Sequence, residues 1–218
     1  MSKVKEKKFL GLYEPSISWS NFLISLECLI ATCLLFSFSL SNQQFYILGI
    51  FISTFFASVC GGIVHGMFKV EEGKLFHFIW KMTLVFMILN GTLVFLSTLY
   101  YFPLFRIGEV YEIFLASVYF LIGFYWVWFK STDFLIALTF YVPVTILLLI
   151  VLVINGIVAG FNSGQGFALL GLGLTLLAGF AQYKQISLKS LKIDHNTLFH
   201  LIQAIALVFI YFWGKLAV

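Results

Sequence analysis

Charged residues are scarce in this chain of 218 residues, because Asp, Glu, Lys and Arg together occupy only 10% of the positions. A soluble domain carries about 25% charged residues. The 61% hydrophobic content is also more than a soluble core of this size could bury. The composition therefore excludes a soluble globular protein and a disordered chain. Three cysteines are too few for a disulfide scaffold, and three prolines exclude a proline-rich linker.

Basic residues are also few, and they are spread along the chain although the net charge is +4. Binding to nucleic acid requires a dense basic patch that neutralises phosphates. We therefore expect no nucleic-acid partner. We interpret the basic residues as signals of membrane topology instead.

Long apolar runs dominate the sequence. A helix that crosses a bilayer needs about 20 mostly apolar residues, and seven such runs are present. The sequence predicts an all-α polytopic membrane protein, a bundle of seven transmembrane helices. A basic cytoplasmic segment at residues 1–17 is expected to precede a single membrane domain at residues 18–218. The predicted spans are 18–39, 45–68, 78–101, 109–129, 133–156, 166–183 and 196–217.

The 13 basic residues predict the orientation of the bundle. Eleven of them fall on the connections at one face, and only Arg106 and Lys215 fall at the other. Because Lys and Arg are enriched in cytoplasmic loops, we expect a cytoplasmic N-terminus, an outside C-terminus and a location in the cell (inner) membrane. The glycines of the second and sixth spans are interpreted as positions where helices approach closely.

All four histidines fall near the predicted cytoplasmic face. His65 lies near the end of the second span, His77 at the start of the third, and His195 and His200 at the start of the seventh. A catalytic zinc ion takes three protein ligands and a water molecule. We predict His65, His195 and His200 as the ligands of such an ion. His77 lies among lysines and is interpreted as an interfacial residue.

Further polar residues at membrane depth extend this candidate site. Ser58 is seven residues before His65 and shares its helical face, and Asn196 lies one turn before His200. Glu27 lies near the middle of the first span, where an ionisable side chain is costly and usually functional. We expect Ser58 or Asn196 to stabilise an oxyanion and Glu27, or Asn90 in the third span, to orient deeper groups. Hydrogen bonding between packed helices is the alternative for Ser58, Glu27 and Asn90, and a role as the N-cap of the last helix is the alternative for Asn196.

This pattern resembles the superfamily of alkaline ceramidases and adiponectin receptors, which includes the haemolysin-III-like bacterial proteins. The resemblance rests on the seven spans, on His65 at the inner end of the second span, and on the segment that ends in Phe199 and His200. It implies a zinc-dependent intramembrane hydrolase that acts on a lipid amide or ester, with membrane lipids as its partners.

The sequence departs from the motifs of that superfamily at three points. Gly61 stands where the family has a serine four residues before its histidine in the second span. Asn196 stands where the family has the first histidine of H-x-x-x-H, and the third span contains no aspartate. His195 is one position out of register, so it can serve as the third ligand only where the entry to the last helix is distorted.

Three functions are compatible with these residues. The first is the ceramidase-like hydrolase with zinc. The second is a non-enzymatic seven-helix protein that binds lipid or acts as a receptor, which the missing serine and aspartate favour. The third is a small transporter or channel in which Glu27 and the histidines lie on a proton or ion path. A haem site with paired histidines is a further alternative.

Overall fold

The computed structural model of the chain describes residues 11–37, 41–68, 73–102, 108–191 and 193–217. Seven helices in this part of the chain are long and apolar enough to cross a membrane. The predictions of an all-helical fold and of seven apolar helices are thereby confirmed, and by this criterion the chain is an integral membrane protein. Most of the expected N-terminal segment at residues 1–17 lies outside the described residues. The helices are α1 (Pro15–Phe36), α2 (Asn42–Met67), α3 (Lys74–Tyr101), α4 (Glu109–Tyr125) with its π-helical continuation η2 (Trp126–Lys130), α5 (Phe134–Ala159), α6 (Ser163–Tyr183) and α7 (His195–Leu216).

Polar caps set the starts of several helices. Ser41 accepts a hydrogen bond from the backbone N–H of Gln44, whose side chain in turn accepts from the backbone N–H of Ser41. This capping box starts α2 at Asn42, three residues before the predicted span. At α7, the Asp194 side chain accepts from the backbone N–H of Thr197. Hydropathy locates an apolar run, whereas the helix extends to its capping residue.

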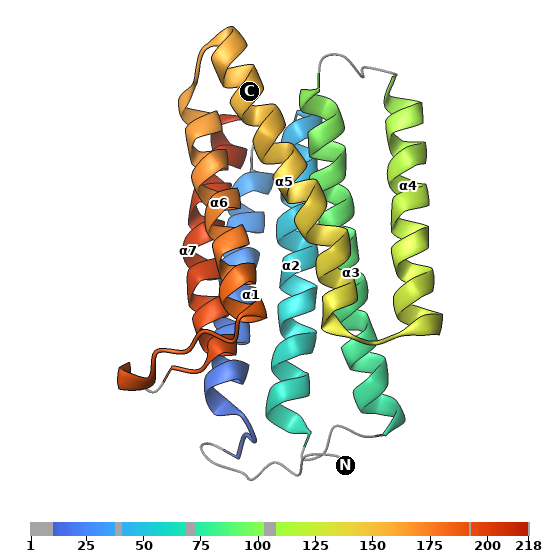
Figure 1. The fold of residues 1–218 in the computed structure, drawn as a ribbon, viewed down its shortest axis with the longest axis vertical. Coiled ribbons are helices and arrows are strands. Elements are labelled where there is room, and N and C mark those ends of the chain that lie inside the picture. Colours follow the sequence, from blue (N-terminus) through green and yellow to red (C-terminus); the bar gives the residue numbers. More distant parts are fainter. Residues whose placement is uncertain (1–10, 38–40, 69–72, 103–107, 192, 218) are drawn as a thin grey trace.

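Six helices form a ring, and α4 lies outside it (Figure 1). In the ring α1 packs on α2 and α7, α3 packs on α2 and α5, and α6 packs on α5 and α7. Toward the end of the bundle at which α2 begins and α7 ends, apolar side chains fill the interior of the ring, including Leu35, Ile47, Phe51, Leu148 and Trp213. The interior toward the opposite end is less completely filled and contains the candidate site.

Glycines allow three of the helix pairs in the ring to approach closely. An added Cβ at Gly62 of α2 would lie 2.8 Å from the Phe22 ring of α1, and one at Gly171 of α6 would lie 3.0 Å from the Ala206 carbonyl oxygen of α7. The interpretation as packing positions is confirmed for Gly62 and Gly171. Gly91 makes a third close approach, between α3 and α5. The same interpretation is wrong for three glycines of α6, at which an added Cβ would meet nothing within 4 Å, namely Gly166, Gly173 and Gly179.

Candidate functional site

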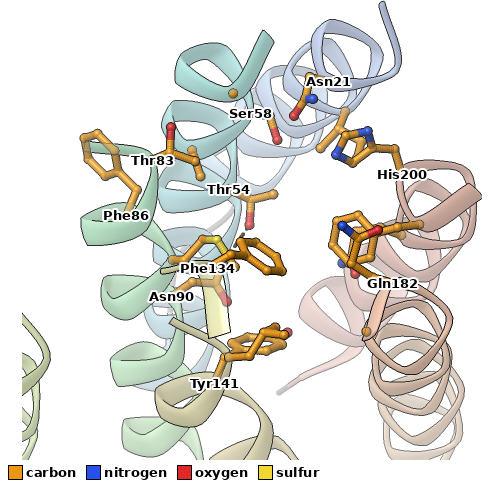
Figure 2. Close-up of a pocket in the computed structure, with 18 of the residues that line it drawn as sticks. Asn21, Thr54, Ser58, Thr83, Phe86, Asn90, Phe134, Tyr141, Gln182 and His200 are labelled. Carbon is orange, nitrogen blue, oxygen red and sulfur yellow. Dashed lines mark hydrogen bonds between the residues drawn. The ribbon is translucent and has the colours of Figure 1, made fainter. Parts of the chain in front are cut away.

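A cavity of about 270 Å³ lies inside the ring, nearer the end at which α1 and α7 begin and α2 ends. All six helices of the ring contribute to its lining, and its walls combine amide, hydroxyl and imidazole groups with aromatic and aliphatic side chains (Figure 2). Among the described residues that line it there is no Asp, Glu, Lys or Arg. The cavity therefore has mainly apolar walls that carry several polar groups, and none of the described lining residues is an acidic or basic side chain with a permanent charge.

Two of the three predicted metal ligands, His65 and His200, line this cavity from α2 and α7. The Nδ1 atom of His65 lies 2.7 Å from Oε2 of Glu14, the residue just before α1. The Nδ1 atom of His200 lies 2.8 Å from the Oγ atom of Ser20 in α1. Because Nδ1 is engaged in both rings, Nε2 is the nitrogen left for a molecule in the cavity.

The third predicted ligand, His195, does not belong to the lining. Asp194 is the N-cap of α7, and the helix runs from His195 onward without the distortion that would turn His195 back. Residues five apart on a helix are rotated by about 140°, so His195 and His200 point in different directions. Within the described part of the chain, no three His, Cys, Asp or Glu side chains are placed so that they could hold a metal ion. Zinc binding stays a prediction.

The predicted catalytic residues divide in the same way. Ser58 and Asn196 line the cavity, whereas Glu27 does not. The Oε1 atom of Glu27 is buried without a hydrogen-bond partner among the described residues. The catalytic roles of all three stay predictions. The transporter alternative, which places Glu27 on an ion path, gains no support from this cavity.

Two matching polar stripes on α6 and α7 form one wall. On α6, Thr175 and Gln182 are seven residues apart, and on α7, Asn196 and Gln203 have the same spacing. Because the helices are antiparallel, Gln182 Nε2 donates to Asn196 Oδ1, and Gln203 Nε2 donates to Thr175 Oγ1 at 3.3 Å. The stripe on α7 was recognisable from its sequence. The stripe on α6 has the same spacing and could have been found by the same signal.

Asn90 of α3 joins the opposite wall to α2. Its Nδ2 atom lies 3.1 Å from the Ile50 carbonyl oxygen, 3.2 Å from Ser53 Oγ and 2.7 Å from Thr54 Oγ1. The alternative interpretation of Asn90 as a bridge between helices is therefore confirmed. The other amide atom, Oδ1, is buried without a partner among the described residues, and the residue lines the cavity.

Asp194 fixes the start of α7 next to α1. Burial acts to raise the pKa of this carboxyl, but hydrogen bonds from the Thr197 N–H, the Thr197 hydroxyl and the Ser16 hydroxyl outweigh burial and lower the pKa. The carboxylate is therefore ionised at neutral pH and favourably placed at a helix N-terminus. This cap positions Asn196 and His200 at the cavity wall.

A comparison with known families gives one result. A family model described as a family of unknown function (DUF6962) matches residues 17–217. No curated protein matches the chain. The family match does not bear on the resemblance to ceramidases and adiponectin receptors, which stays an expectation. Because the match covers nearly the whole chain, the protein belongs to the DUF6962 family.

Proposed function

We propose that this membrane protein binds one small, uncharged amphipathic molecule in the cavity of the ring. The observation that carries the proposal is the lining, which sets neutral polar groups beside the rings of Trp80, Phe86 and Phe134. Small-molecule sites commonly combine apolar walls with a few polar groups that orient the ligand. A charged ligand would lose its hydration without gaining a Lys, Arg, Asp or Glu partner among the described lining residues.

We further propose that the cavity lies toward the cytoplasm. Four of the lysines whose side chains are described lie at the end of the bundle that contains the cavity, whereas Lys215 lies at the opposite end. Basic residues accumulate on the cytoplasmic side of membrane proteins, which supports the predicted cytoplasmic N-terminus and the inner cell membrane. Most of the other basic residues used for that prediction lie outside the described residues. The four lysines are Lys74, Lys81, Lys130 and Lys184.

Trp80 provides a direct readout of cavity binding. Its ring lines the cavity, and its Nε1 donates to the Thr132 carbonyl oxygen at 2.8 Å. We expect a brominated long-chain alcohol, titrated into the protein in phosphatidylcholine nanodiscs, to quench Trp80 fluorescence saturably. Trp80→Phe should remove the saturable part and leave the linear quenching of lipid-facing tryptophans. Trp126→Phe, at a tryptophan 47% exposed, is the matched control and should retain saturation.

A second candidate is the metal-dependent hydrolase that the resemblance implies. The observation in its favour is that metal-binding histidines usually engage a carboxylate or another oxygen through their second ring nitrogen. Glu14 and Ser20 occupy that place on His65 and His200. The described residues supply only two of the three protein ligands that an open zinc centre uses. The donor set is therefore incomplete, and no zinc-dependent step follows from this geometry.

Metal content distinguishes the two candidates. We expect protein purified in detergent without chelators to contain well below one zinc ion per chain, because no three potential ligands come together among the described residues. Elemental analysis of the unmodified protein and of the His65→Ala and His200→Ala variants provides the measurement. A full equivalent of zinc that is lost in both variants but kept in His77→Ala would favour the hydrolase instead.

A further inference from the structure

Two buried amide oxygens at the cavity have no hydrogen-bond partner among the described residues. They are Oδ1 of Asn90 on α3 and Oε1 of Gln182 on α6. Nearly all buried polar atoms in native proteins have a partner in the protein, in ordered water or in a ligand. Two such oxygens on one cavity therefore indicate hydrogen-bond donors that the described residues do not supply.

The orientation of the Asn90 amide is fixed by its surroundings. Its Nδ2 atom faces the Ile50 carbonyl oxygen at 3.1 Å, and a backbone carbonyl can only accept a hydrogen bond. Exchanging the two amide atoms would place two acceptors against each other, so the hydrogen-bond network assigns the oxygen as the free atom. Oδ1 of Asn90 is thus an acceptor, and it is left for a molecule in the cavity.

The Gln182 amide offers a second acceptor on the opposite wall. In the orientation that the structure gives this amide, Nε2 donates to Asn196 Oδ1, which leaves Oε1 without a donor among the described residues. Figure 2 shows Asn90 and Gln182 on opposite sides of the space that the lining residues surround. A single molecule that reaches both walls needs a donor for each, and no charge is required of it.

We infer that the ligand is a neutral lipid with at least two free hydroxyl groups, which donate to Asn90 Oδ1 and Gln182 Oε1. This inference rests on the proposed function and narrows it to one chemical class. A hydroxyl carries a donor and no charge, which suits both acceptors and a lining without acidic or basic side chains among the described residues. A fatty acid methyl ester has the same kind of apolar chain but offers no donor, so both oxygens would stay unpaired.

Competition in the Trp80 quenching assay tests the inference. Monodecanoylglycerol, which has two free hydroxyls, should displace the brominated alcohol at least about tenfold more effectively than methyl decanoate. Asn90→Leu and Gln182→Met should each reduce this advantage by roughly three- to tenfold, while leaving competition by methyl decanoate nearly unchanged. Thr92→Val is the matched control, because the buried Thr92 hydroxyl on the same helix as Asn90 donates to the Ile88 carbonyl oxygen and does not line the cavity.

The outcomes separate the inference from the proposed function. Equal competition by the two lipids would overturn the inference that ligand hydroxyls donate to these two oxygens. Water would then be the partner of both oxygens, and the proposal that the cavity binds a ligand would still hold. Absence of saturable quenching by the brominated alcohol would overturn the binding site itself. Gln182→Met is nearly isosteric and lies next to the end of α6, so it keeps the test decisive if Asn90→Leu fails to fold.

Discussion

Gly179→Leu is expected to abolish saturable binding of the brominated alcohol while the protein stays folded. Gly179 lines the cavity between Thr175 and Gln182 on the same face of α6, and an added Cβ meets nothing within 4 Å. A leucine side chain would therefore extend into a cavity of only about 270 Å³ and occupy the space of a ligand. Replacing glycine inside a helix also favours the helix by about 1 kcal/mol, so thermal stability should not fall.

Gly173→Leu is the matched control for this experiment. Gly173 lies on the same helix, also has open space beside its Cα, and is not among the residues that line the cavity. Titrations of both variants in nanodiscs, with thermal unfolding measured on the same samples, give the comparison. Unchanged binding by Gly179→Leu would show that the ligand binds elsewhere. Loss of binding in both variants would show that the effect is not local to the cavity.

Gly91→Val is expected to produce the largest loss of stability, about 3 kcal/mol in the free energy of unfolding. An added Cβ at Gly91 would lie 2.7 Å from the Phe140 carbonyl oxygen and 3.3 Å from the Tyr141 Cα. Both atoms are backbone, so the clash cannot be relieved by a change of rotamer. The helices α3 and α5 would have to separate, which would also displace Tyr141 from the cavity wall.

The thermal unfolding midpoint in detergent measures this effect. Gly173→Val introduces the same side chain where no atom lies within 4 Å of an added Cβ, and it should change the midpoint little. Equal midpoints for Gly91→Val and Gly173→Val would contradict the close approach of α3 and α5. If Gly91→Val both lowers the unfolding midpoint and loses the saturable quenching of Trp80, the close approach of α3 and α5 also determines the shape of the cavity.

The number of helices was predictable because each crossing requires one long apolar run, and such runs are unambiguous in this composition. The ends were less predictable. The helix α3 begins at Lys74, four residues before the predicted span, because a polar or basic residue lowers hydropathy without ending a helix. The exclusion of α4 from the ring was not predictable at all, since hydropathy does not report which helices pack together.

The candidate site was predictable where helical spacing decides the face. Ser58 and His65 are seven residues apart and both line the cavity, as expected. His195 was placed in the site by its residue type, whereas the Asp194 cap fixes its direction away from His200. The position of Glu27 near the middle of the first apolar helix could be inferred from the sequence, but the side of α1 that faces the cavity could not. That side is set by the neighbouring helices.

The central claim is that the cavity accepts an uncharged amphiphile. Its most direct test compares a brominated alcohol with a brominated carboxylate of equal chain length, titrated at about pH 8, where histidine is ordinarily neutral. For the alcohol we predict saturable quenching of Trp80 at one site per chain. For the carboxylate we predict only linear quenching, because the described lining residues include no Lys or Arg to stabilise the charge. Saturable quenching by the carboxylate at equal or lower concentration, or linear quenching by both probes, would contradict the claim.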